Sequence, residues 1–416
     1  MAHPNQSMTI ASPFLLGCNY WPRKKAMYWW ANYDAGEVRE EFALIKELGL
    51  RYVRLFLLWE SFQPKPEQVS ASAIKNLLTT CDIAGEIGLC MQPTFFTGHM
   101  SGPNWAPDWL LNGQPRVEGE RQLVSLGRKD GSPFGIYNVY TEPFVVEAEK
   151  LQLRTVCGAL KDHPAVWAYS LGNEPDLFCR PPNALAGKAW VREMVRTIKS
   201  VDATHPVLIG LHTASLHADV GLRVDHVAEE TDISVMHGYS IYDRLARHLL
   251  DPDYVPFMAA LTAALAKRPV IFEEFGLCTH ENDEPSRVID MPQWNGKIRS
   301  NLFASDEDGA EYYRQVLPRL QRVGALGAFA WCFPDYDRSL WNLPPCDFQW
   351  HERFFGLVRA DGRIKPMGKA VQDFARTNPV VQAAERTVML PDSGDEFYKN
   401  PELYLKDLYE KFLNLK

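Results

Sequence analysis

The sequence of 416 residues lacks the features that mark several large classes of protein. It has no run of about 18 consecutive apolar residues, which argues against a membrane-spanning helix. Lys and Arg number 44 against 52 Asp and Glu, and the net charge is −8. Because no basic stripe is present, we expect neither nucleic acid nor a membrane as a partner. The oligomeric state is left open.

Motifs that bind cofactors or metals are also missing. The chain contains no GxGxxG, GxxxxGK[S/T] or HExxH motif and no CxxC pair. We therefore expect no organic cofactor and no metal. The eight cysteines are scattered, and the first residues lack the basic start and apolar stretch of a secretory signal. These features predict reduced thiols and a cytoplasmic location.

Short apolar runs alternate with helical patterns along most of the chain. Near-continuous apolar strands that alternate with helices indicate a parallel sheet covered by helices. Eight such units most simply close into an α/β fold of the (β/α)8 TIM-barrel type. An open doubly wound sheet is the alternative, but its nucleotide-binding motifs are missing. The predicted strands cover residues 14–22, 52–59, 89–96, 168–173, 206–212, 232–240, 269–276 and 327–334.

Helical spacing of apolar residues follows the strands, and we predict a catalytic barrel over residues 1–377. The last part of the chain, from residue 378 to residue 416, has a different character. It ends in an aromatic, charged stretch with helical spacing, which predicts an appended helical segment that packs on the barrel exterior. The clearest of the other predicted helices cover residues 35–49, 72–88, 142–160, 188–201, 309–324 and 365–376.

Polar side chains occur at the ends of several predicted strands. In a TIM barrel the active site lies at the carboxyl ends of the strands. A polar group buried there without a hydrogen-bond partner lowers the stability of the fold, so these side chains point to a site. Glu174 ends the fourth strand, and Glu273 and Glu274 lie on the seventh. Strands four and seven face each other across a closed barrel, so we expect Glu174 to meet one of the other two.

Two carboxylates over one site are what glycosidic cleavage requires. One donates a proton to the leaving oxygen, and the other attacks the anomeric carbon or activates water. Their pKa values must differ. We expect Arg54 to keep the second carboxylate ionised, and burial with a negative neighbour to keep Glu174 protonated. Because Glu273 and Glu274 are adjacent, only one should enter the mouth of a regular barrel, and periodicity does not decide which.

Three motifs resemble the retaining glycoside hydrolases of clan A. They are LGNEP at the end of strand four, HGY on strand six and FEEFG on strand seven, and their order is fairly specific. The chain is most similar to family five, which includes cellulases, β-mannanases and β-mannosidases. The resemblance covers residues 14–375 and implies double displacement by Glu174 as acid/base and Glu274 as nucleophile. Substrate-binding roles are implied for Arg54, Asn173, His237, Tyr239 and Trp331. The role of His99, after strand three, is left open.

The resemblance also implies a β-linked substrate. FEEFG looks like the mannan-active members, and a cytoplasmic enzyme is better suited to short imported oligosaccharides than to polymers. Long loops after strands one, three and eight could close a groove into a pocket. We therefore expect an exo-acting β-mannosidase on short β-mannosides, including mannose-β-1,4-N-acetylglucosamine. The alternatives are a β-glucosidase or β-galactosidase, an intracellular endo-β-mannanase, a non-catalytic carbohydrate-binding barrel and a metal-dependent barrel hydrolase.

Overall fold

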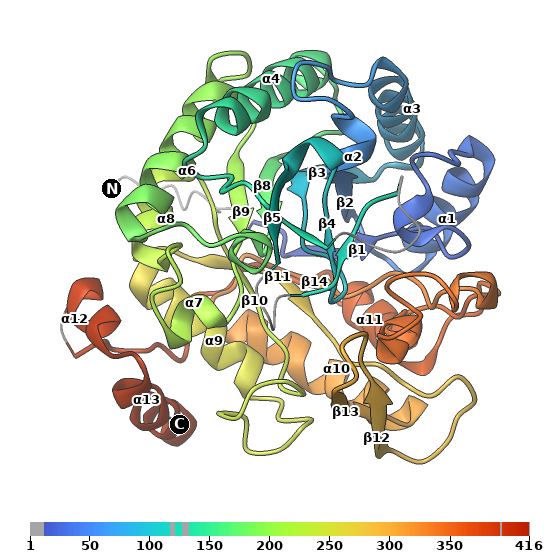
Figure 1. The fold of residues 1–416 in the computed structure, drawn as a ribbon. Helices are drawn as coiled ribbons and strands as arrows, with labels where there is room; N and C mark the ends of the chain where they lie inside the picture. Colours follow the sequence, from blue (N-terminus) through green and yellow to red (C-terminus); the bar gives the residue numbers. More distant parts are fainter. Residues whose placement is uncertain (1–11, 117–120, 127–132, 392, 416) are drawn as a thin grey trace, which may run out of the picture.

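The computed structural model describes residues 12–116, 121–126, 133–391 and 393–415. Its centre is an eight-stranded parallel sheet in the order β10-β11-β14-β1-β2-β3-β8-β9 (Figure 1). A parallel bridge between His212 and His237 joins the last strand to the first, so the barrel is nearly closed. The strands are β1 (Leu15–Tyr20), β2 (Tyr52–Leu58), β3 (Cys90–Thr97), β8 (Tyr169–Asn173), β9 (Val207–Gly210), β10 (Ser234–His237), β11 (Val270–Phe275) and β14 (Gly327–Ala330).

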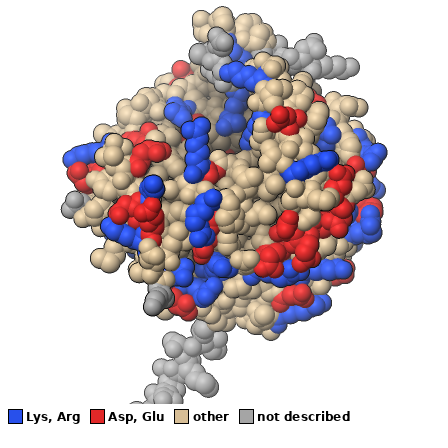
Figure 2. Space-filling model, turned by 90° about the horizontal axis from the view of Figure 1, so that it is seen from below, with Lys and Arg blue, Asp and Glu red and all other residues tan. Residues whose placement is uncertain are grey.

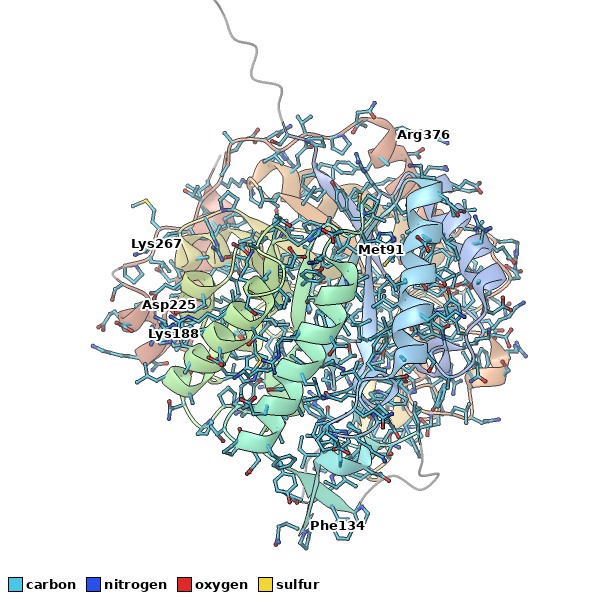
Figure 3. All side chains as sticks on the ribbon, turned by 90° about the horizontal axis from the view of Figure 1, so that it is seen from above. Met91, Phe134, Lys188, Asp225, Lys267 and Arg376 are labelled. Carbon is cyan, nitrogen blue, oxygen red and sulfur yellow. The ribbon has the colours of Figure 1, made fainter. Side chains whose placement is uncertain are left out.

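One helix follows each barrel strand, and the helices surround the barrel (Figures 1 and 3). The predicted (β/α)8 barrel is therefore confirmed. In chain order the helices are α1 (Ala35–Glu47), α3 (Ala71–Ile87), α4 (Pro143–Leu160), α6 (Ala184–Lys199), α8 (Val224–Glu230), α9 (Tyr254–Ala266), α10 (Asp306–Arg322) and α11 (Pro366–Arg376).

Local sequence explains the first of these helices. The Asp34 side chain caps α1 by accepting hydrogen bonds from two backbone N–H groups of its first turn, those of Gly36 and Glu37. Val38, Phe42 and Ile45 follow at helical spacing and are buried. The helix therefore begins at a polar cap and packs one apolar face toward the sheet.

The barrel interior is filled at one end and polar at the other. A small separate cluster of buried apolar side chains takes one residue from each of four strands and one from the position just before β8. These residues are Leu208, Val235, Ile271 and Phe329, and Ala168. Above this layer lie charged residues that belong to the site described below. Such layering is the usual interior of a TIM barrel, whose open end carries the functional groups.

Loops at the carboxyl ends of the strands contain additional short elements. Phe134 in one of these loops and Arg376 at the end of α11 lie at opposite ends of the molecule (Figure 3). The short elements are α2 (Trp59–Phe62), α5 (Pro175–Phe178), α7 (Ala214–His217), the strand pairs β4 (Asn104–Trp105) with β6 (Leu123–Val124), β5 (Leu111–Pro115) with β7 (Phe134–Ile136), and the hairpin β12 (Arg287–Pro292) with β13 (Ile298–Phe303).

The chain ends in two helices, α12 (Gly394–Lys399) and α13 (Glu402–Asn414), at the edge of the barrel (Figure 1). The Tyr409 ring packs on Phe257 of α9 with a centroid separation of 4.7 Å. The Tyr398 hydroxyl donates to the Ser215 carbonyl at 2.7 Å, and Glu402 lies 3.2 Å from His217. These contacts fix the two helices against α9 and α7.

The surface shows no separation of charge on the face drawn in Figure 2, where basic and acidic side chains are interspersed. None of the helices in the described part of the chain combines the length and apolarity that a membrane crossing requires. The cytoplasmic location stays a prediction.

Candidate active site

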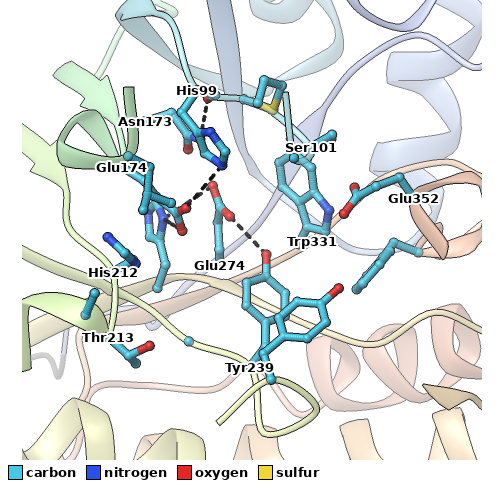
Figure 4. Close-up of a pocket in the computed structure, with 18 of the residues that line it drawn as sticks. His99, Ser101, Asn173, Glu174, His212, Thr213, Tyr239, Glu274, Trp331 and Glu352 are labelled. Atoms are coloured by element: carbon cyan, nitrogen blue, oxygen red, sulfur yellow. Dashed lines mark hydrogen bonds and ion pairs between the residues drawn. The ribbon is translucent and has the colours of Figure 1, made fainter. Parts of the chain in front are cut away.

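Glu174 and Glu274 meet at the mouth of the barrel (Figure 4). One carboxylate oxygen of each lies within 4.8 Å of the other and of one ring nitrogen of His237. The Glu174 side chain is 13% exposed and that of Glu274 is 5% exposed. The structure thus brings together the carboxylates that were expected to face each other from the fourth and seventh strands.

The backbone after β8 directs Glu174 into the mouth. Glu174 has φ of 45°, in the left-handed region that a residue with a side chain adopts only when its surroundings impose it. Its N–H donates to the carbonyl of Gly210 at 2.9 Å, which holds it against β9. Gly210 has no space for a side chain, because a Cβ there would lie 2.8 Å from His237 and 2.9 Å from Arg54.

Arg54 is fully buried and connects several strands below the two carboxylates. Its guanidinium donates to a carboxylate oxygen of Glu274. It also donates to Asn173 Oδ1 at 2.9 Å, to Asn19 Oδ1 at 3.0 Å and to Thr94 Oγ1 at 3.1 Å. A planar guanidinium makes several directed bonds at once, so it fixes the Glu274 carboxylate in place.

Glu273 also reaches the barrel interior, so the two neighbours do not point to opposite faces of the strand as expected, although only Glu274 enters the mouth. The pairing of β11 with β10 skips one residue, so that His237 pairs with Glu274. This irregularity breaks the strict alternation of side chains. Glu273 lies 3.2 Å from Arg54 Nε and 3.2 Å from His237 Nε2, and it accepts a hydrogen bond from Gln92. It is fully buried below the pocket, whereas Glu274 lines the pocket.

His237 and Tyr239, the predicted His-x-Tyr of the sixth strand, both contact the carboxylates. His237 Nδ1 lies 3.2 Å from Glu174 Oε1, and the Tyr239 hydroxyl donates to Glu274 Oε2 at 2.9 Å. Burial lowers the pKa of His237, but the charge of Glu274 and the hydrogen bonds to Glu174 and Glu273 outweigh burial and raise it to about 9. His237 is therefore a cation at neutral pH.

The pKa order of the two facing glutamates is the reverse of the expected one. Burial acts to raise the pKa of Glu174, but the charge of His212 and the bond and charge of His237 bring it below its usual range. Burial raises the pKa of Glu274, and His237 and Arg54 offset this only in part. The expectation counted Arg54 beside Glu274 and omitted the histidines beside Glu174. That omission explains the error.

A pocket of about 370 Å³ opens above these groups. Trp331, which follows β14, forms part of its wall beside Glu274 (Figure 4). Asn173 lies at its edge, and its amide donates to the His99 carbonyl at 3.0 Å. The loop after the third strand and that after the eighth line this pocket, as expected. Among the described residues the remaining wall includes the β12–β13 hairpin rather than the loop after the first strand.

Sequence reasoning missed several residues of this pocket. His212 ends the fifth predicted strand, and its Nε2 lies 2.9 Å from Asp176 Oδ2. His99, whose role was left open, places Nε2 4.0 Å from Glu174 Oε2. Glu352 lies on the loop after β14, and burial raises its pKa to about 7. His212 could have been found as another polar strand end, but Glu352 carries no pattern that predicts its position.

The same atoms have the chemistry of a possible cation site. One atom each from Glu174, His237 and Glu274 could ligate a metal ion, although a cationic imidazole is not a ligand. Because the pKa of His237 is about 9, binding a metal at neutral pH would require it to lose a proton. The arrangement therefore suits proton transfer and nucleophilic attack better than metal binding.

The fold and the site define a class, the (β/α)8 barrels in which two carboxylates face each other at the open end. Comparison with known proteins confirms the resemblance to the clan A barrels of glycoside hydrolase family 5. No family model matches the chain. A putative mannan endo-1,4-β-mannosidase 9 of Oryza sativa subsp. japonica is 28% identical over 201 residues, which span 42% of this chain. Mannan endo-1,4-β-mannosidase 8 of the same organism is 29% identical over 203 residues.

The matched region spans about half the length of these curated relatives, 48% and 53%. Solved structures match over more of the chain. A GH5_18 protein of Streptomyces cattleya in complex with Manβ1-4GlcNAc has a TM-score of 0.69 at 24% identity, covering 88% of this chain and 80% of that protein. An exo-β-1,4-mannosidase of Opitutaceae bacterium strain TAV5 has a TM-score of 0.71 at 25% identity, covering 89% and 60%.

Proposed function

We propose that this chain is a retaining β-glycosidase that hydrolyses short β-mannosides by double displacement, from the non-reducing end. The observation that carries the proposal is the separation of the Glu174 and Glu274 oxygens, which is within 4.8 Å. Retaining glycosidases hold their carboxyl groups about 5–5.5 Å apart, whereas inverting enzymes need about 6.5–9.5 Å to admit a water molecule. The distance supports attack by a carboxylate rather than by water.

In the first step Glu274 attacks the anomeric carbon while Glu174 protonates the leaving oxygen. In the second step Glu174 takes a proton from water, and the resulting hydroxide equivalent releases the sugar from Glu274. Arg54 and Tyr239 hold the Glu274 carboxylate by hydrogen bonds. In the first step Glu174 must carry the proton, against the charges of His212 and His237 that lower its pKa.

Two observations support β-mannosides and action at a chain end. The similar structures include one with Manβ1-4GlcNAc bound and one named an exo-β-1,4-mannosidase. The pocket of about 370 Å³ is at the small end of the range of ligand sites, about 300–1,000 Å³. A small pocket suits one or two sugar units. The rice relatives, in contrast, are named endo-mannosidases, so endo-β-mannanase is the second candidate.

A panel of 4-nitrophenyl β-mannoside, β-glucoside, β-galactoside and β-xyloside tests the glycone. We expect the mannoside to have the highest kcat/KM, and NMR should show that the first product is the β-anomer. Manβ1-4GlcNAc should be cleaved faster than mannan. A preference for mannan would favour the endo-enzyme, and an α-anomer as first product would contradict retention.

Azide separates the two glutamates. The variant Glu274→Ala should lose turnover and regain part of it with azide, which attacks from the vacated face and yields an α-glycosyl azide. The variant Glu174→Ala should instead yield a β-glycosyl azide, because azide attacks the intermediate on Glu274. If Glu274→Ala keeps full activity, Glu273 becomes the nucleophile candidate. Loss of activity in EDTA with recovery in zinc would favour a metal-dependent hydrolase, and sugar binding without hydrolysis would favour a binding barrel.

A further inference from the structure

Glu352 is a buried acid in the pocket that the two-carboxylate mechanism does not use. It lies in a short 3-10 turn (Trp350–Phe354) and is only 8% exposed. Its Oε2 makes no hydrogen bond of full geometry among the described residues, although the Ser101 hydroxyl and the Trp331 indole lie close enough to this carboxyl to lower its pKa. Leaving a buried carboxyl oxygen unpaired costs stability, so a group of this kind needs an explanation.

The surroundings of Glu352 contain further polar atoms. Its Oε1 lies 3.4 Å from His351 Nε2, the Ser101 hydroxyl faces the same carboxyl, and His351 Nδ1 has no hydrogen-bond partner in the described part of the chain. All three residues line the pocket. Several polar atoms gathered at one pocket wall, with hydrogen-bonding capacity left on Glu352 Oε2 and His351 Nδ1, suit the hydroxyl groups of a ligand.

The position of Glu352 relative to the catalytic pair indicates which part of a sugar it would meet. Glu174 protonates the leaving oxygen, so the aglycone lies on its side of the pocket. Trp331 stands beside Glu274, and Glu352 lies beyond Trp331, on the side away from Glu174 (Figure 4). A sugar ring that extends from Glu274 over Trp331 therefore brings its far carbons toward Glu352.

We propose that Glu352 binds the glycone, with Oε2 accepting a hydrogen bond from a hydroxyl at C3 or C4, the hydroxyl-bearing ring carbons farthest from the anomeric carbon. The inference rests on the proposed glycosidase function and adds a specificity-determining residue to it. A carboxylate there accepts a hydrogen bond from a free hydroxyl of the terminal sugar of an oligosaccharide. A further sugar attached at the contacted position would remove that donor and place bulk against Glu352, so this residue also enforces cleavage at the chain end.

The test compares wild type with Glu352→Ala and Glu352→Gln on 4-nitrophenyl β-mannoside and its 3-deoxy and 4-deoxy analogues. In wild type, removing the contacted hydroxyl should lower kcat/KM by about 10- to 100-fold. In Glu352→Ala the same removal should change kcat/KM by less than about threefold, because the acceptor is gone. Glu86→Gln, an exposed carboxylate on α3, is the matched control and should keep the wild-type penalty.

The proposal is overturned if both deoxy analogues carry the same penalty in the Glu352 variants as in wild type. A purely structural residue would slow all substrates alike. Should Glu352→Ala fail to fold, the near-isosteric Glu352→Gln gives the same comparison.

If wild type cleaves no aryl β-glycoside, the proposed function fails on its own. Titration of tryptophan fluorescence with mannose, 3-deoxymannose and 4-deoxymannose then tests Glu352 without catalysis. A deoxy penalty in wild type that is lost in Glu352→Ala would support the proposal, and an equal or absent penalty would refute it.

Discussion

Replacing Arg54 with methionine should both destabilise the barrel and stop turnover. The guanidinium donates to Glu274, Asn173, Asn19 and Thr94 in a fully buried site, and Glu273 lies 3.2 Å away. Removing it leaves the Glu273 and Glu274 carboxylates buried with one fewer cation. Breaking a buried ion pair in this way costs about 3–5 kcal/mol, a large share of the roughly 5–15 kcal/mol that stabilise a typical protein.

Urea unfolding at pH 7, followed by tryptophan fluorescence, measures this loss as a shift of the midpoint at unchanged slope. Arg39→Met is the matched control, because Arg39 makes an exposed ion pair with Glu86 and should cost less than about 1 kcal/mol. Arg54→Lys should fall between the two, since an ammonium cannot reproduce the planar set of bonds. If Arg54→Met costs no more than Arg39→Met, the network does not hold the carboxylates and the reasoning fails.

Three further predictions follow from single contacts. Glu174→Ala should lower kcat/KM far more for Manβ1-4GlcNAc than for 2,4-dinitrophenyl β-mannoside, which needs little protonation, and equal losses would contradict the acid role. His237 has a pKa of about 9, above its ordinary value near 6.5, so its stabilising charge is complete below about pH 6.5 and is lost as pH rises through about 9. The free energy of unfolding should therefore fall from pH 7 to pH 10, and fall less in His237→Gln. Tyr409→Phe removes a 2.7 Å hydrogen bond to the Asp251 carboxylate and should cost about 1.5–3 kcal/mol, whereas Tyr404→Phe on the same helix should cost less.

The barrel could be predicted from sequence because each strand is a short apolar run and each helix has its own spacing. The eight predicted strands all occur, and α1 begins where Asp34 caps it. Closure of the barrel predicted that Glu174 would meet a glutamate of strand seven, and the resemblance of FEEFG to family five singled out Glu274. These features depend on local pattern and on simple geometry.

Other features depend on contacts that no local pattern encodes. The inward position of both Glu273 and Glu274 results from a skipped residue in the pairing of β11 with β10. The low pKa of Glu174 depends on His212, which comes from a neighbouring strand. Glu352 enters the pocket from a loop whose path is set by packing. Such side-chain positions depend on the tertiary fold and cannot be predicted from local sequence.

The bonds from α12 and α13 to α7 have a consequence for the pocket itself. The turn that carries His212, Thr213 and Ala214 along the pocket wall continues directly into α7. Helices α12 and α13 contact α7 at Ser215 and His217. The terminal helices thus support the pocket wall beside Glu174 from outside the barrel. Cutting the chain after residue 390 should loosen that wall and weaken the proposed turnover, although every described residue that lines the pocket would still be present.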